Sequence, residues 1–365
     1  MVAESRKTYA LTGAGGFLGW HVKVAIHSMG CEFLEIPLGE RFDTVDAARA
    51  LSSADGLIHL AGVNRGTDDA VASGNRLFAA QLRSALEQTD VPPASVAYAN
   101  STQSQNGSIY GQAKVEASET LAAAAVQTGA EFRDVLLPNL FGEHGRPFYN
   151  SVIATFCHQL ATGAGEPAVQ EDRDLTLLHA QDAADWLTGE REDVVDVLRQ
   201  ASVSELLARL KSMSDTYGVG DVPDLSTPFA RDLFNTYRSY TPVGTVPLRG
   251  GSDQRGTFVE MARSWGGTGQ SSFSTTVPGV TRGNHYHRRK VERFVVVAGR
   301  AEMQMRRLFT QDVIRITADN EPVAVDQLTG WTHNLINVGE ETLYTLFWTN
   351  DIFDPANPDT FMESV

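Results

Sequence analysis

Four residues with metal-binding side chains stand at regular spacings in the last third of the chain. His285, His287 and Glu292 lie within the sequence GVTRGNHYHRRKVERFVVVAG, and His333 follows in the sequence GWTHNLIN. Imidazole nitrogens and a carboxylate oxygen suit zinc, iron or manganese, and such a set leaves positions open for a substrate. Neighbouring β-strands could bring these residues to one ion. The sequence therefore predicts a site for a divalent metal, with zinc, iron and manganese as the candidates.

A different chemistry is indicated by Ser101, Tyr110 and Lys114. Tyr110 and Lys114 are four residues apart, so on a helix they share one face and the ammonium can lower the pKa of the phenol. Such a phenol can donate a proton to a carbonyl oxygen while hydride arrives from a nicotinamide. Ser101, at the end of a predicted strand, could hydrogen-bond the same carbonyl, with Thr102 as the nearest alternative. This set predicts a carbonyl reductase.

A glycine-rich loop, TGAGGFLG, supports that reading because it lies between an apolar strand and an apolar-periodic helix. The backbone N–H groups of such a loop and the helix N-terminus can hold a pyrophosphate. The GxxGxxG spacing is typical of short-chain dehydrogenases and reductases. The residues predicted to contact the dinucleotide are Gly13, Gly16, Phe17, Leu18, Gly19, Arg41, Leu60, Ala61, Gly62, Tyr110 and Lys114.

The same region bears on which nicotinamide is used. An acidic residue directly after the second strand would bind the ribose 2′-hydroxyl of NAD, but Pro37, Leu38 and Gly39 stand there. Arg41 is close enough in sequence to meet a 2′-phosphate. We therefore expect NADP(H) in preference to NAD.

These residues lie in two regions whose sequences predict different patterns of secondary structure. Up to about residue 245, predicted strands such as residues 56–63 and 95–101 alternate with predicted helices such as residues 75–88 and 110–126, which is typical of an α/β domain with a parallel sheet. Beyond it the chain predicts short strands with period-two alternation, as in a β-barrel or jelly roll. We expect a Rossmann-type domain over residues 1–245 and an all-β domain over residues 246–365.

Composition restricts the function further. The chain has 365 residues and a formal net charge of −15, which argues against nucleic acid or an anionic membrane as a partner. Basic residues nevertheless gather between Arg282 and Arg307, which favours a small anionic substrate, although a solvated strand face would look the same. The opening residues, MVAESRKT, leave no room for a signal peptide, and Cys31 and Cys157 are far apart. We expect a cytoplasmic protein without a membrane segment.

The two predicted sites are chemically compatible. A proton on the carbon next to a ketone becomes removable when a cation holds the enolate oxygen, and its return on the other face inverts that carbon. Reduction of the ketone then fixes the new configuration. His287, Glu292 and Lys290 are candidate proton carriers, and the sequence does not rank them.

The spacing around the predicted metal ligands resembles the two motifs of the cupin family, with Leu328 where a proline is usual. Over nearly its whole length the chain resembles the CapF family of bacterial capsular polysaccharide synthesis proteins. The segments that carry this resemblance are HLAGVNR (59–65), PNLFG (138–142), YNSVIATFC (149–157), DLTL (174–177), RDLFNTYRSYTP (231–242), RGTFVE (255–260), GNHYH (283–287), THN (332–334) and FDPANPDT (353–360).

The resemblance implies a homodimer that acts on a UDP-linked 2-acetamido-2,6-dideoxy-4-ketohexose. A cupin domain would epimerise C3 and a short-chain reductase domain would reduce C4 with NADPH, giving UDP-N-acetyl-6-deoxytalosamine on the route to UDP-N-acetyl-L-fucosamine. Ser101, Tyr110 and Lys114 would serve reduction, and His285, His287, Glu292 and His333 would hold zinc. Ile109 and Ala113 differ from the residues usual in the family, which leaves the sugar, its N-acyl group and the nucleotide open.

Other functions fit the residues less well. A reductase with a structural, dimerising barrel keeps only one of the two activities, and a sensor that binds without catalysis would not need Ser101, Tyr110 and Lys114. A 4,6-dehydratase of this fold needs an acidic pair near the serine, and residues 103–105 supply none. An aldolase is likewise disfavoured.

Overall fold

The computed structural model describes residues 6–319 and 321–365 and divides the chain into two compact units. The first unit contains the chain up to Leu140 together with Thr176–Gln200, and the second contains Phe141–Leu175 together with Ala201–Val365. The expectation that the chain has no signal peptide depends on the opening segment MVAESRKT. Residues 1–5 of that segment lie outside the described residues.

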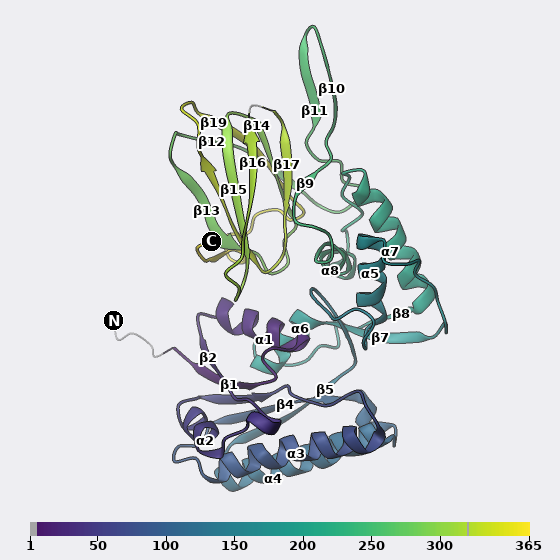
Figure 1. The fold of residues 1–365 in the computed structure, drawn as a ribbon, viewed down its shortest axis with the longest axis vertical. Helices are drawn as coiled ribbons and strands as arrows, with labels where there is room; N and C mark the ends of the chain where they lie inside the picture. The colour runs from purple at the N-terminus through teal and green to yellow at the C-terminus, as the bar shows by residue number, and fades with distance from the viewer. Residues whose placement is uncertain (1–5, 320) are drawn as a thin grey trace. The chain divides into compact units, whose positions relative to one another are not determined.

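A parallel sheet with the strand order β2-β1-β3-β4-β5 forms the centre of the first unit. Its strands are β1 (Thr8–Thr12), β2 (Glu32–Glu35), β3 (Gly56–His59), β4 (Ser95–Ser101) and β5 (Glu131–Leu137). The helices of this unit are α1 (Phe17–Ser28), α2 (Thr44–Ser52), α3 (Asp68–Glu87), α4 (Ile109–Thr128) and α6 (Ala180–Thr188), with the 3-10 helices η1 (Gly39–Arg41) and η2 (Thr102–Gln105). Figure 1 shows these elements in purple and blue, with α6 in teal.

Both faces of this sheet are covered, which explains why the central strand β3 is buried at every position. Leu57 packs into a core with residues of α2, α3 and α4, whereas the next residue, Ile58, packs into a second core with residues of α1 and α6. Successive strand residues point to opposite faces, so a strand that is buried on both sides must be apolar at every position. The predicted Rossmann-type fold is confirmed.

The second unit contains two antiparallel sheets, with the orders β12-β19-β14-β17-β9 and β16-β15-β18-β13-β20. Their strands are β9 (Thr245–Val246), β12 (Gln270–Thr276), β13 (Thr281–Tyr286), β14 (Glu292–Ala298), β15 (Arg300–Arg307), β16 (Val313–Asp319), β17 (Val323–Gln327), β18 (Trp331–Asn337), β19 (Leu343–Thr349) and β20 (Phe361–Met362). Phe294 and Leu343 of one sheet share a core with Met303 and Leu335 of the other. The predicted all-β region is therefore a sandwich of two sheets.

The second unit also holds the helices α5 (Val152–Thr162), α7 (Val203–Gly218) and α8 (Pro228–Arg238), and an exposed hairpin of β10 (Arg249–Asp253) and β11 (Gly256–Glu260). The residues of the short strands β6 (Asn139–Phe141), β7 (Asp174–His179) and β8 (Arg199–Ser202) are divided between the two units, and these strands form a sheet in the order β6-β7-β8. Helix α8 is absent from the sequence prediction. It begins at Pro228, where Thr227 accepts a hydrogen bond from the N–H of Ala230, which is a standard helix cap.

The change from alternating helices and strands to strands alone occurs where the sequence predicts it. Helix α8 ends at Arg238, and every element assigned after it in the described residues is a strand. The compact units nevertheless group α5, α7 and α8 with the sandwich. A boundary between two domains near residue 245 therefore stays a prediction. Among the described residues, we find no helix with the length and apolar character that crossing a bilayer requires.

Candidate functional site

The glycine loop of the first unit owes its shape to close backbone approaches. Gly13 has a φ of +69°, and a Cβ atom there would lie 2.7 Å from the backbone nitrogen of Ala61. A Cβ at Gly19 would lie 2.3 Å from the carbonyl oxygen of Gly13. Helix α1 starts after Gly16 without a side-chain cap from the described residues, and Phe17, Leu18 and Gly19 form its first turn. The N–H groups of that turn can therefore bind a pyrophosphate.

The ends of β1 and β3 are tied together beside this loop by Thr12. Its hydroxyl lies 2.6 Å from Nδ1 of His59 and accepts hydrogen bonds from the backbone N–H groups of Leu60 and Ala61 at 3.1 and 3.2 Å. Burial, and then the nearby Lys114 charge, lower the pKa of His59 to about 3, so its ring is neutral and Nδ1 accepts the hydroxyl proton. The predicted cofactor residues Leu60 and Ala61 are thus held in place by Thr12, which the sequence did not reveal.

Arg41 lies at the end of η1, which follows β2, and its side chain is exposed. The last residue of β2 is Glu35, which pairs with Lys23 at 3.4 Å. Because Arg41 is exposed and follows β2 closely, its guanidinium could meet a phosphate group beyond the carboxyl end of that strand.

Ser101 and Tyr110 are brought together by two adjacent elements. Ser101 ends β4 and begins η2, where its hydroxyl accepts a hydrogen bond from the N–H of Gln103. Helix α4 begins after Ser108, whose hydroxyl accepts from the N–H of Gly111. A Cβ atom at Gly111 would lie 2.3 Å from the carbonyl oxygen of Gln103, so a glycine at this position lets η2 pack onto the helix. The side chain of Ser101 hydrogen-bonds Tyr110 in this arrangement.

The pKa of the Tyr110 phenol is raised rather than lowered, which corrects the expectation drawn from the sequence. Burial raises it, and the hydrogen bond with Ser101 offsets only part of that effect. The Lys114 ammonium donates instead to the carbonyl oxygen of Ala99 at 2.7 Å and lies 4.1 Å from the ring centre of Tyr98. A raised pKa keeps the phenol protonated at neutral pH, which is the form that a proton donor needs.

Lys114 is almost fully buried, and burial lowers the pKa of its ammonium from 10.5 to about 7, although Asp134 acts in the opposite direction. Between those two values the unfolded chain binds more protons than the folded one, so the free energy of unfolding rises with pH. We expect wild type to gain roughly 1 kcal/mol per pH unit over Lys114→Met between pH 7.5 and 10. Urea unfolding at several pH values measures this difference, and a difference that does not change with pH would contradict it.

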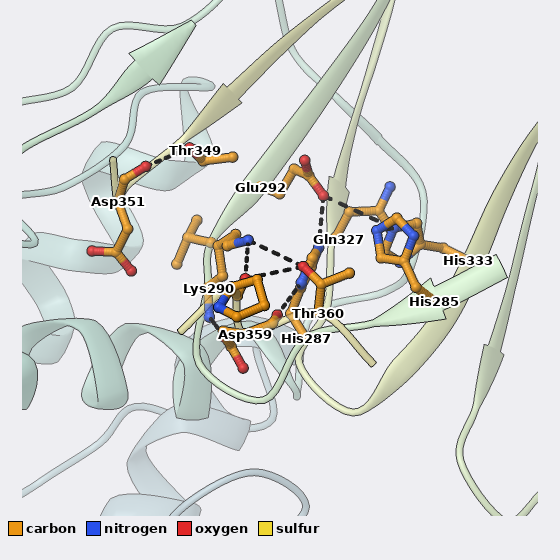
Figure 2. A network of polar contacts seen from close by, with 12 residues as sticks. His285, His287, Lys290, Glu292, Gln327, His333, Thr349, Asp351, Asp359 and Thr360 are labelled. Atoms are coloured by element: carbon orange, nitrogen blue, oxygen red, sulfur yellow. Dashed lines mark hydrogen bonds and ion pairs between the residues drawn. The ribbon is translucent and has the colours of Figure 1, made fainter. Parts of the chain in front are cut away.

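In the second unit the four residues predicted as metal ligands lie together, and their ligand atoms are within 4.8 Å of one another. Nε2 of His287 is 2.8 Å from a carboxylate oxygen of Glu292, and the Nε2 atoms of His285 and His333 are 3.1 Å apart. The same Glu292 oxygen is 3.9 Å from Nε2 of His333. Figure 2 shows these side chains converging from β13, β14, β18 and the loop after β13. We call them the His/Glu cluster.

A β-bulge aims the first of these histidines. The register of β13 against β18 shifts between Gly283 and His285, and the intervening Asn284 has a φ of +59°. A Cβ atom at Gly283 would lie 2.8 Å from the carbonyl oxygen of His333, so a glycine allows the two strands to approach closely here. Bulges re-aim side chains in this way at many functional sites.

The electrostatics of the cluster fit a divalent cation. Burial and then the neighbouring His287 lower the pKa of His285 to about 4 and that of His333 well below its ordinary value. Burial alone would raise the pKa of Glu292, but its hydrogen bond with His287 leaves the pKa lowered. Neutral imidazoles and an ionised carboxylate are the forms that bind a metal. Nδ1 of His287 lies 2.6 Å from the carbonyl oxygen of Asp359, and donation to that oxygen leaves the Nε2 lone pair facing the cluster.

The loop that carries His287 is held by Asp359, which the sequence analysis did not single out. The carboxylate of Asp359 accepts hydrogen bonds from the backbone N–H groups of Arg288, Arg289 and Lys290 at 3.0, 2.9 and 2.7 Å. The Lys290 ammonium donates to the carbonyl oxygen of Pro358 at 2.7 Å. These contacts, drawn in part in Figure 2, join residues 287–290 to the C-terminal segment. We call them the Asp359 clamp.

Substituting Asp359 by asparagine should loosen this loop. The amide turns one acceptor oxygen into a donor that faces backbone N–H groups, so we expect a loss of about 2 to 3 kcal/mol in unfolding free energy and weaker binding of added zinc. Chemical unfolding and calorimetric zinc titration measure both effects. Asp354→Asn is the matched control, because Asp354 lies in the same segment and its carboxylate accepts a hydrogen bond from the N–H of Ala356, away from residues 287–290. Equal zinc affinity for wild type and Asp359→Asn would contradict the clamp.

Comparison with known proteins adds independent evidence. Residues 9–189 match the model of the NAD dependent epimerase/dehydratase family, and residues 251–361 match that of the polysaccharide biosynthesis C-terminal domain. A Pseudomonas aeruginosa protein named UDP-2-acetamido-2,6-beta-L-arabino-hexul-4-ose reductase is 32% identical over 371 residues, which cover 97% of this chain and 98% of the relative.

Solved structures of similar fold match this chain over 98% of its length. The capsular polysaccharide assembling protein CapF from Staphylococcus aureus is 29% identical with a TM-score of 0.62, and the match covers 98% of this chain and 100% of that one. CapF with the inhibitor 3-isopropenyl-tropolone matches at 28% identity and a TM-score of 0.53 over the same shares. Likeness at this identity across both units extends the resemblance from short motifs to the complete molecule, and the chain therefore belongs to the CapF family of capsular polysaccharide synthesis proteins.

Proposed function

We propose that the chain is a bifunctional nucleotide-sugar enzyme that epimerises C3 of a UDP-2-acetamido-2,6-dideoxy-4-ketohexose and then reduces C4 with NADPH. The observation that carries the proposal is the presence in one chain of a hydrogen-bonded Ser101 and Tyr110 with Lys114 on the same helix, and of the His/Glu cluster. The name of the Pseudomonas relative supports the reductase half and the substrate class. The product would be UDP-N-acetyl-6-deoxytalosamine, a precursor of UDP-N-acetyl-L-fucosamine, made in the cytoplasm.

The reduction follows from the geometry of the first unit. Hydride from the nicotinamide would add to C4 while Tyr110 gives its phenolic proton to the C4 oxygen, so that the ketone becomes an alcohol. The raised pKa of Tyr110 keeps this proton in place until then. The Ser101 hydroxyl would hydrogen-bond the same oxygen and then stabilise the phenolate that remains.

The epimerisation is assigned to the second unit. A divalent cation held by His285, His287, Glu292 and His333 would stabilise negative charge on the C4 oxygen, which makes the C3 proton removable. Because Nε2 of His287 faces Glu292 inside the cluster, we assign His287 to ligand binding. That leaves Lys290 as the proposed proton carrier. In its neutral amine form, the two N–H groups of Lys290 would donate to Pro358 and, at 3.4 Å, to Thr360. The nitrogen lone pair would then accept the C3 proton, and the resulting ammonium would return a proton to that carbon.

The chemistry also sets the order of the two steps. Loss of the C3 proton requires the neighbouring ketone, and reduction removes that ketone. Epimerisation must therefore precede reduction.

The preference for NADPH over NADH is proposed from the exposed Arg41 after β2 and is tested by comparing kcat/KM for the two cofactors. A homodimer is proposed from the family resemblance and is tested by light scattering, which should give twice the chain mass of 39.7 kDa.

The deciding experiment gives the purified protein, zinc and NADPH a UDP-4-keto-6-deoxy-N-acetylhexosamine in deuterium oxide. We expect NADPH oxidation, deuterium at C3 and inverted configuration at C3 by NMR. Oxidation of NADPH with retention at C3 would support the alternative of a reductase whose sandwich has only a structural role. Absence of both reactions would contradict the proposal as a whole.

A further inference from the structure

A fifth polar side chain, Gln327, lies next to the His/Glu cluster. Gln327 is the last residue of β17, and its register partner on β14 is Glu292, which on its other side faces Thr349 of β19. Residues directly opposite in an antiparallel pair have their side chains on the same face of the sheet. The side chain of Gln327 is therefore on the face that Glu292 presents to the histidines, and Figure 2 shows it among them.

Gln327 is buried without a hydrogen bond to its side-chain oxygen. Its exposed fraction is 3%, and Oε1 has no partner among the described residues. The residue is nonetheless firmly placed, because the guanidinium of Arg238 on α8 donates to its backbone oxygen at 2.8 Å. A buried amide oxygen that lacks a partner costs about 1 to 3 kcal/mol, so an apolar residue would be the more stable choice at this position.

The groups on this face of the sheet explain what could satisfy the amide oxygen. They are the imidazoles of His285, His287 and His333 and the carboxylate of Glu292, whose ligand atoms lie within 4.8 Å of one another. When the imidazoles are neutral and the carboxylate is ionised, these atoms are lone-pair donors to a metal, and so is an amide oxygen. One cation satisfies all of them at once.

We propose that the amide oxygen of Gln327 is an additional ligand to the divalent ion of the His/Glu cluster, an inference that rests on the metal site in the proposed function. The ligand set would then be three imidazoles, a carboxylate and an amide oxygen. An oxygen donor beyond four ligands raises the coordination number of the ion to five or more, which zinc, manganese, iron and cobalt can all accept. One further position of an octahedral ion would take the keto-sugar oxygen.

The test measures metal binding directly and does not depend on turnover. Metal-free full-length protein is titrated with Co²⁺ in a calorimeter and in a visible spectrophotometer, for wild type, Gln327→Leu and Gln327→Glu. We expect Gln327→Leu to bind Co²⁺ about 10-fold more weakly or worse, and its d–d absorption to become more intense as the coordination number falls. Gln327→Glu keeps an oxygen donor and should retain at least wild-type affinity.

Gln304→Leu is the matched control, because Gln304 is another glutamine of the sandwich whose amide nitrogen already donates to Glu302 at 2.6 Å. It should bind Co²⁺ like wild type. Near-ultraviolet circular dichroism checks that each variant is folded. A Gln327→Leu protein that is folded and has wild-type affinity and spectrum would overturn the inference, and so would equal weakening in Gln304→Leu.

The outcome can be separated from that of the proposed function. If Co²⁺ binding depends on Gln327 but no deuterium enters C3, the ligand assignment stands and the epimerase proposal fails. If His333→Ala binds Co²⁺ as tightly as wild type, the cluster is not the metal site and the inference fails with it.

Discussion

Replacing Tyr110 by phenylalanine should reduce the rate of ketone reduction by about 100- to 10,000-fold, because the substitution removes the proton that the C4 oxygen needs. The ring still fills its place on α4, and the loop that binds the dinucleotide is untouched. Binding of NADPH, followed by fluorescence titration, should therefore change little. Stopped-flow loss of NADPH absorbance with the 4-keto sugar measures the chemical step.

The same variant separates the two proposed activities. Tyr110 belongs to the first unit and the His/Glu cluster to the second, so deuterium should still enter C3 of the ketose at the wild-type rate. Tyr98→Phe serves as the control, since it removes another buried phenol from the same region. A Tyr110→Phe protein that reduces the ketone within 10-fold of the wild-type rate would exclude Tyr110 as the proton donor.

The second large effect is expected for alanine at both His285 and His333. Loss of two imidazoles leaves His287 and Glu292 as the remaining members of the cluster, and two ligands hold a divalent ion poorly. We expect bound zinc, measured by atomic absorption after dialysis, to fall to the background level and deuterium exchange at C3 to be lost. Reduction at C4 should continue, and the product should now retain its original configuration at C3.

A double variant that still catalyses C3 exchange would show that the sandwich is not the epimerase. Histidine substitution could instead disturb the sheets, so a control is needed outside the cluster. His158→Ala removes a histidine of α5 in the same unit, and it should affect neither zinc content nor exchange.

Local spacing explains how much of both sites could be predicted. The glycine loop, the Tyr110 and Lys114 pair and the segment from His285 to Glu292 each lie within one short stretch, where helix and strand periodicity decides which side chains share a face. His333 could be predicted because it stands in the sequence GWTHNLIN, whose spacing resembles the second cupin motif. The structure brings the four residues of the His/Glu cluster together and sets Ser101 beside Tyr110, whereas the Lys114 ammonium turns elsewhere. The roles of these residues stay predictions.

The remaining contacts depend on tertiary structure. Gln327 meets Glu292 through the register of β14 and β17, which periodicity alone does not give. Asp359 is far from Lys290 in sequence, and its type and neighbours are those of an ordinary loop residue. Its place in FDPANPDT, a segment that carries the family resemblance, could have drawn attention to it. The pKa of Tyr110 was predicted wrongly, because the direction in which Lys114 points depends on the carbonyl of Ala99 and the ring of Tyr98.

The Asp359 clamp has a consequence for the order of events during synthesis. The loop with His287 and Lys290 is held by a residue near the end of the chain, and β20, which pairs with His285 and Tyr286, follows at once. Translation delivers Ser101, Tyr110 and Lys114 well before Asp359. A growing chain can thus fold the dinucleotide site while the loop with His287 still lacks the carboxylate that holds it, so the reductase half is expected to take its final form first.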